Sequence, residues 1–239
     1  MALDSDQHRI VVHRCPGTDA GIIPTLLGSG VLSHALTAEG RLVLHAAAVE
    51  VGGRGLAIMG ASCAGKSTVA ALMCAGGAAL VTDDALRVDP IDGGAVCFPG
   101  NRTLRLRPTA ASLGEEIGGA ELSESADGRT TVAPPEAADT PLELAAVLIP
   151  SPSREATELE VVRLGARDGL VELISNPRLA AWQVSWPVVR HFDLTTRIAE
   201  SVPVFRATVP WGPPFEPGLA GELLAAAGLD SPASERSKA

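Results

Sequence analysis

Residues 60–67 read Gly60-Ala61-Ser62-Cys63-Ala64-Gly65-Lys66-Ser67, which is the pattern G-x-x-x-x-G-K-S of a phosphate-binding (Walker A) loop. Glycines allow backbone angles that other residues avoid, so successive N–H groups can turn toward a phosphate. In this pattern Lys66 supplies a compact charge for the outer phosphates, and the Ser67 hydroxyl supplies a ligand for Mg²⁺. Only two of the 19 Lys and Arg residues are lysines. The predicted nucleotide-binding residues are these eight and Thr68.

The loop has the flanks that such a motif requires. Residues 55–59 form a short apolar run that indicates a buried strand, and residues 66–75 have apolar side chains at helical spacing, closed by Gly76-Gly77. The N-terminus of that helix directs its partial positive charge toward a bound phosphate. A glycine-rich turn that matches by chance is the alternative, and it does not explain the strand and the helix.

A second group of polar residues is predicted at the same edge of the sheet. Residues 41–51 indicate a strand that carries His45, and Gly52-Gly53 indicates a tight turn into the strand before the loop. Residues 78–82 indicate another buried strand, which ends in Asp83-Asp84. Ligands of open α/β sheets bind at the carboxyl ends of strands. The alternatives are a turn or helix cap for the acidic pair and a hydrogen-bonded core residue for His45.

The segment after the acidic pair indicates short antiparallel strands at residues 86–88, 95–98 and 103–107. Alternation in the last of these strands puts Arg105 and Arg107 on one face. We interpret that face as solvated, with a substrate or phosphate contact as the alternative.

One kinase-like domain is predicted over residues 1–229, with a disordered tail at 230–239. Residues 109–140 are rich in small and polar residues and are interpreted as a mobile loop or lid, with an idle surface loop as the alternative. Within them, the capping-box pattern Ser112-x-x-Glu115 indicates the start of a short helix. Beyond them, the expected strands are at residues 142–149, 158–164 and 204–209, and the expected helices at 168–175, 188–202 and 218–227.

Composition excludes several classes of protein. The formal net charge of −9 argues against nucleic acid as the main partner. No apolar run approaches the roughly 20 residues that span a bilayer, so no membrane association is expected. The four cysteines lack metal-site or disulfide spacing, which indicates a reducing, cytoplasmic compartment.

The run from His45 to Asp84 resembles the catalytic core of HPr kinase/phosphorylase. The shared features are a strand with Leu44-His45, a glycine turn, the phosphate loop with its helix, and an apolar strand that ends in Asp83-Asp84. The segments from His191 and from Pro203 are similar to the C-terminal part of shorter related kinases, some of which phosphorylate a serine of a lasso-peptide precursor. The resemblance implies an α/β fold with a P-loop core and a mixed, partly antiparallel sheet, similar to HPr kinase and PEP carboxykinase.

The resemblance also implies roles for individual residues. Asp84 matches the base that accepts the proton of a substrate serine, and His45 and Lys66 are the other predicted catalytic residues. Ser67 and Asp83 are the predicted metal ligands, and ATP and Mg²⁺ are the implied cofactors. The glycine-rich signature that supplies a metal-binding glutamate in HPr kinases has no match here, although Glu115 and Glu116 lie in that region.

The function expected from the sequence is therefore an ATP-dependent serine kinase that acts on a peptide or small protein, such as a lasso or other modified-peptide precursor. The alternatives are a nucleotide-binding switch without transfer and a small-molecule kinase. The expected partners are the acceptor and, from the family, further copies of the chain in a homo-oligomer. The sequence leaves open the acceptor, the choice between ATP and GTP, and the oligomeric state.

Overall fold

The main sheet is built around one long strand, β12 (Leu142–Ser153). The computed structural model describes residues 2–4, 9–17, 23, 26–125, 128–178 and 185–229, so the predicted tail lies outside the described residues. One edge of β12 pairs in parallel with β5 (Arg54–Met59). The sheet continues through antiparallel β4 (Ala46–Val51) to β6 (Ala79–Thr82). Because β5 and β6 are both antiparallel to β4, they run in the same direction and end at the same edge.

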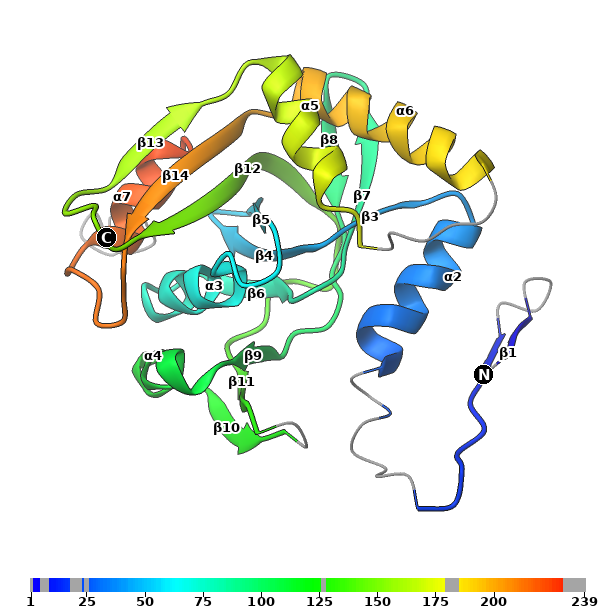
Figure 1. Cartoon of the computed structure of the whole chain (residues 1–239), viewed down its shortest axis with the longest axis horizontal. Coiled ribbons are helices and arrows are strands. Elements are labelled where there is room, and N and C mark those ends of the chain that lie inside the picture. Colours follow the sequence, from blue (N-terminus) through cyan, green and yellow to red (C-terminus); the bar gives the residue numbers. More distant parts are fainter. Residues whose placement is uncertain are drawn as a thin grey trace.

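The other edge of β12 is shared by two groups of strands (Figure 1). Its first residues pair with β8 (Gly94–Cys97), which continues to β7 (Leu86–Ile91) and β3 (Leu42–Leu44). Its last residues pair in parallel with β14 (Val204–Pro210), which continues to antiparallel β13 (Glu160–Arg163). The sheet is thus mixed and curled. This confirms the predicted α/β fold with a P-loop and a partly antiparallel sheet.

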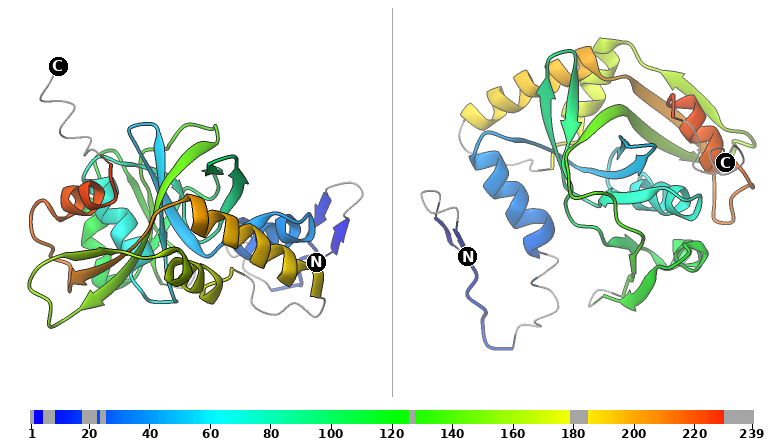
Figure 2. Two further views of the ribbon diagram at one scale, coloured as in Figure 1. Left: turned by 90° about the horizontal axis from the view of Figure 1, so that it is seen from above. Right: turned by 180° about the vertical axis from the view of Figure 1, so that it is seen from behind.

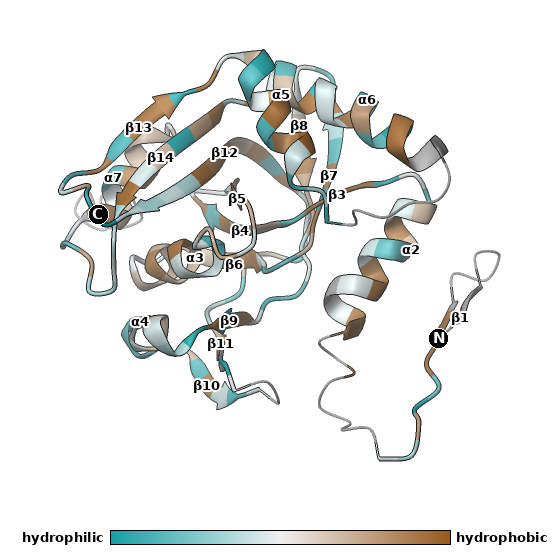
Figure 3. Ribbon diagram, viewed as in Figure 1, coloured by the Kyte–Doolittle hydropathy of each residue, from teal (hydrophilic) through white to brown (hydrophobic). Residues whose placement is uncertain are grey.

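Alternation along the strands gives the sheet two apolar faces. In β5, Leu56 and Ile58 join the core on one face, whereas Ala57 and Met59 join the core on the other. The first face is covered by α3 (Lys66–Ala75) and α7 (Leu219–Ala226), and the second by α5 (Ala166–Ser175) and α6 (Ser185–Ser201). Figure 3 shows hydrophobic residues concentrated on α3 and on the central strands.

The segment predicted to be a mobile loop or lid contains regular structure. It includes the 3-10 helix η2 (Pro108–Ala110), α4 (Ser112–Glu116), β10 (Glu121–Glu124) and β11 (Thr130–Ala133). β11 pairs with both β10 and β9 (Leu104–Leu106), and α4 packs against α3. This small sheet buries Leu104, Leu106 and Val132 against the loop helix. The segment therefore forms a wall beside the phosphate loop.

The short helix predicted within this segment is present as α4, but the predicted capping box is not. Ser112 is the first residue of α4 itself, and the preceding residue, Ala111, forms no side-chain cap. The pattern requires the serine to precede the helix with its backbone outside the helical region. Here Ala111 already has helical angles because it continues from η2.

The strand predicted over residues 41–51 is two strands. β3 and β4 are separated at His45, and they pair with different neighbours, β7 and β5 respectively. His45 therefore lies at a break in the sheet, where its side chain is free to leave the apolar layer.

Helical spacing places residues 188, 192, 195, 199 and 202 of the expected late helix on one stripe, and in the structure this stripe is only partly buried. Thr195, Ala199 and Val202 are buried, but Val188 and Phe192 are exposed. The first half of α6 extends beyond the sheet (Figure 1), so no core lies beneath these two side chains.

The N-terminal elements lie at one side of the molecule. The strands β1 (Ala2–Asp4) and β2 (Arg9–Val11) form a hairpin that lies away from the main sheet (Figure 2). The π-helix η1 (Leu27–Val31) continues into α2 (Leu32–Ala38), which leads into β3. None of the helices in the described ranges is both long and apolar enough to cross a membrane.

Candidate active site

The phosphate loop connects the end of β5 to the start of α3, as its sequence predicts. Three of its residues, Gly60, Cys63 and Gly65, have positive φ angles of 149°, 70° and 87°. At Gly65 a Cβ atom would lie 3.4 Å from Pro152 Cγ, so this position combines a left-handed backbone with close packing against the end of β12. The loop thereby directs the N-terminus of α3 into an open cavity.

Lys66 lies along the loop at the start of α3. Its Nζ donates hydrogen bonds to the carbonyl oxygens of Gly60, at 2.9 Å, and Ala61, at 3.1 Å. Burial lowers the pKa of the Lys66 ammonium, and the nearby carboxylates Asp84 and Asp83 oppose that shift. The cationic side chain is thus held over the loop, where a phosphate would lie.

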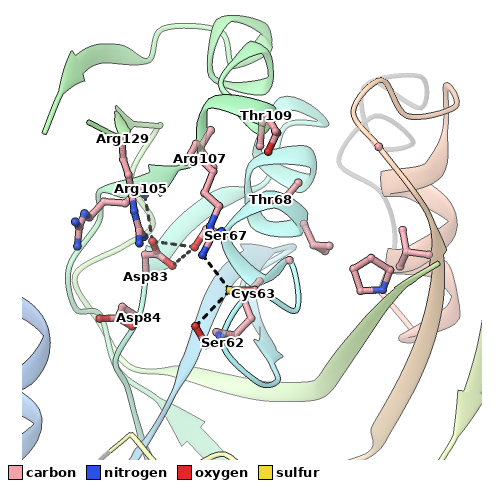
Figure 4. A pocket seen from close by; sticks show the side chains of 18 of the residues that line it. Ser62, Cys63, Ser67, Thr68, Asp83, Asp84, Arg105, Arg107, Thr109 and Arg129 are labelled. Carbon is pink, nitrogen blue, oxygen red and sulfur yellow. Dashed lines mark hydrogen bonds between the residues drawn. The ribbon is translucent and has the colours of Figure 1, made fainter. Parts of the chain in front are cut away.

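Ser67 and Asp83 converge on one point. The Ser67 hydroxyl lies 3.0 and 3.2 Å from the two carboxylate oxygens of Asp83, and the Arg105 backbone N–H donates to the same carboxylate at 3.3 Å (Figure 4). Asp83 is only 4% exposed, and burial raises its pKa to about 6 even though the Ser67 hydrogen bond opposes the shift.

This pair of residues fits a magnesium ion. Mg²⁺ is usually held by one or two protein oxygens, and water and substrate phosphates complete its shell. No group of three or more His, Cys, Asp or Glu side chains arranged to hold a metal occurs within the described ranges. A hydroxyl and a buried carboxylate beside a phosphate loop are the sparse ligand set that a nucleotide-bound Mg²⁺ requires.

Asp84 follows Asp83 but points elsewhere. Its φ of 75° is unusual for a residue other than glycine, and a hydrogen bond from Ala85 N–H to the Asp83 carbonyl closes a tight turn around it. Its two carboxylate oxygens lie 3.1 Å from His45 Nδ1 and 2.8 Å from the Arg178 guanidinium. Strain of this kind often accompanies a functional position.

Three arginines from the small sheet line the cavity. Arg105 is the middle residue of β9, Arg107 follows β9, and Arg129 precedes β11 (Figure 4). The predicted alternation along this strand is confirmed, because Leu104 and Leu106 are buried on the opposite face. Arg107 is exposed to solvent, as predicted, and the small sheet turns this face toward the phosphate loop, which favours the alternative of a phosphate contact. The Arg107 guanidinium donates to Cys63 Sγ at 3.0 Å.

The cavity that these elements enclose has a volume of about 630 Å³. The predicted site residues that line it are His45, Ser62, Cys63, Gly65, Lys66, Ser67, Thr68, Asp83 and Asp84. Gly60, Ala61 and Ala64 complete the loop without lining the cavity. The remaining lining includes Asn101, the three arginines, and apolar residues from the ends of β12 and β14.

Arg178 is the contact that sequence reasoning missed. It lies 94 residues from Asp84, directly after α5, in a stretch that matches no motif. No local pattern identifies such a residue, because its position depends on how α5 packs on the sheet.

Comparisons with known proteins add a remote structural likeness. No protein-family model and no curated protein sequence matches the chain. Among solved structures, the chain is similar to the Hpr(Ser) kinase/phosphatase from Coxiella burnetii, with 12% identity over 82% of this chain and 97% of the other, at a TM-score of 0.33.

Proposed function

We propose that this chain is an ATP-dependent serine kinase that transfers the γ-phosphoryl group of Mg²⁺-ATP to a hydroxyl of a peptide or small protein. The observation that carries the proposal is the convergence of the phosphate loop, the Ser67–Asp83 pair and the Asp84 carboxylate on one cavity. Phosphoryl transfer needs mainly positioning, charge stabilisation and an acid that orients the attacking hydroxyl. The site contains a candidate for each of these parts.

The proposed binding of nucleotide uses the loop and its charges. Backbone N–H groups of residues 60–68 and the N-terminus of α3 hold the phosphates, with Lys66 at the outer ones. Ser67 and Asp83 hold Mg²⁺, which neutralises charge on the transferred group. The side chains of Arg105, Arg107 and Arg129 add positive charge around the cavity, although the whole chain has a formal charge of −9. The basic lining favours an anionic ligand.

The proposed transfer step uses Asp84. The acceptor hydroxyl oxygen attacks the γ-phosphorus and forms a new P–O bond. The bond from that phosphorus to the bridging oxygen of ADP breaks, and ADP leaves with the electron pair. The hydroxyl proton moves to the Asp84 carboxylate, which His45 and Arg178 hold in place.

Peptide as the acceptor class is supported by the sequence resemblance to short kinases that act on peptide precursors, including lasso-peptide precursors. The two rival functions are a nucleotide switch that transfers nothing and a kinase for small hydroxyl compounds. Both use the same loop, so nucleotide binding alone does not separate them.

The test compares the wild-type chain with Asp84→Asn, using radiolabelled ATP, Mg²⁺, and both peptides encoded near its gene and small alcohols as acceptors. A serine kinase labels a peptide serine, and Asp84→Asn loses labelling but keeps ATP affinity. Labelling of small alcohols alone would support the small-molecule kinase. ATP binding without labelling of any acceptor would support the switch. Lys66→Ala serves as the control, because it weakens binding under all three functions.

A further inference from the structure

One end of the cavity differs in chemistry from the rest. The ends of β12 and β14 contribute Pro152, Val209 and Pro210, and the chain that follows contributes Trp211 and Phe215. Strand pairing places Pro152 beside Val209, and Pro152 also packs against Gly65 of the phosphate loop. This apolar end therefore begins directly at the loop.

The apolar end and Asp84 lie on opposite sides of the loop helix. Figure 4 shows Asp84 on one side of the N-terminus of α3, and the end of β14 with the following segment on the other. A nucleotide whose γ-phosphate faces Asp84 extends its sugar and base away from that residue. The sugar and base therefore extend from the charged part of the cavity toward its apolar end.

Trp211 is the largest side chain at this end. It is 55% exposed, and the Arg154 guanidinium lies over its ring at 4.1 Å from the centroid. A cation in this position is attracted to the indole face and fixes the orientation of the ring. Because Trp211 lines the cavity and more than half of its surface is exposed, it offers an aromatic surface on which a planar ring can stack.

Resting on the proposed function, we infer that this apolar end binds the base of the nucleotide, with Trp211 as the stacking surface and Pro152, Val209, Pro210 and Phe215 around it. Apart from the indole N–H of Trp211, these side chains offer no hydrogen-bonding group. Selection at this end therefore depends on stacking area rather than on a pattern of donors and acceptors. Both purines, ATP and GTP, bind similarly, and the smaller pyrimidine base of CTP binds more weakly.

The experiment titrates the full chain by calorimetry with the Mg²⁺ complexes of ATP, GTP, CTP and inorganic tripolyphosphate, which has no base. Trp211→Ala weakens ATP binding by about 5- to 150-fold, the range for loss of one base–aromatic stack. Its affinity for tripolyphosphate stays within about twofold of the wild type. Trp211→Phe keeps a ring and retains most of the ATP affinity. Phe192→Ala removes an exposed aromatic that does not line the cavity and leaves all four affinities unchanged.

Each other outcome overturns the inference in a recognisable way. Equal losses for ATP and tripolyphosphate in Trp211→Ala and in Trp211→Phe would mean that Trp211 supports the phosphate loop and not the base, which overturns the inference. Unchanged ATP affinity with a raised KM for a peptide acceptor would assign Trp211 to the acceptor. If the wild type binds ATP no more tightly than tripolyphosphate, the base site is absent while the proposed function stands. If it binds neither, the proposed function fails and the base site with it.

Discussion

The surroundings of Asp83 and of Asp84 differ sharply, although the two residues are adjacent. Asp83 is buried against Ser67 and the backbone of β9, and its pKa is raised to about 6. The side chain of Asp84 is 34% exposed and lies between His45 and Arg178. One carboxylate is thus enclosed beside the phosphate loop, and the other faces the open cavity between two basic groups.

The difference comes from one backbone turn. A strand alternates its side chains between two faces, but the positive φ of Asp84 ends β6 in a tight turn. After the turn, the Asp83 carboxylate faces Ser67, and the Asp84 carboxylate faces His45 and Arg178. The buried Asp83 can then hold a metal ion, and the more exposed Asp84 can act on the acceptor.

The largest effect is expected from Asp84→Asn. An amide keeps the shape of the side chain but accepts no proton, and removal of a general base costs about 10²- to 10⁴-fold in rate. We expect phosphoryl transfer to fall by that factor, while Mg²⁺-ATP affinity, measured by calorimetry, changes little. A variant that transfers phosphate at the wild-type rate would remove Asp84 from the reaction.

The second effect concerns the stability of the metal-free chain. The pKa of Asp83 is raised from 3.8 to about 6, so the folded state binds a proton more tightly than the unfolded state does. The stability that this proton contributes is fully present below about pH 4 and is lost as the pH rises through about 6, a change of about 3 kcal/mol.

Asp83→Asn removes this dependence. Urea unfolding at pH 4 and at pH 7 should show that the variant gains about 2 kcal/mol relative to the wild type between the two values, because the wild type has already lost part of this stability at pH 4. The neighbours Ser67, Arg105 and Asp84 are the same in both chains. The difference between the two stability curves therefore reports on the Asp83 carboxyl alone. Parallel stability curves for the two proteins would show that Asp83 titrates normally.

A smaller effect is expected from the partners of Asp84. A hydrogen bond to a charged group contributes about 1.5–3 kcal/mol, so Arg178→Ala and His45→Ala should each slow transfer by about tenfold or more with ATP affinity unchanged. In the Asp84→Asn background neither change should have a further effect, because the carboxylate that they position is gone. Additive losses would mean that these residues act elsewhere.

The smallest effect concerns thiol reactivity on the Asp83 side of the cavity. Cys63 is exposed, and its pKa is lowered by the Ser62 hydrogen bond and by Arg107, whereas burial raises the pKa of Cys74 to about 12 and of Cys97 to about 11. In a Cys15→Ser background, iodoacetamide at pH 7 should label Cys63 alone in the folded chain. Mass spectrometry would locate the label, and Mg²⁺-ATP should slow it. Equal labelling with and without nucleotide would mean that phosphates do not cover Cys63.

The elements near the loop were predictable because each rests on a local pattern. The strand before the loop, the helix at residues 66–75 and the strand that ends at the acidic pair all occur where expected. The break at His45 was not predictable, since apolar residues on both sides of it, 42–44 and 46–49, read as one continuous strand, and only the pairing of β3 and β4 with different strands separates them. The strands within residues 109–140 were missed because their small sheet is stabilised by packing on α3, not by strongly apolar sequence.

By itself, the sequence determined the phosphate loop, its strand and helix, the acidic pair after β6, and the alternation that puts Arg105 and Arg107 on one face. Hydrogen bonds and side-chain periodicity within a short stretch are enough to specify these features. Only the tertiary structure decided what each feature faces: His45 and Arg178 reach Asp84 across 39 and 94 residues, and β14 carries Trp211 to the cavity. Such contacts depend on how distant segments pack on a common sheet, and no local pattern encodes that packing.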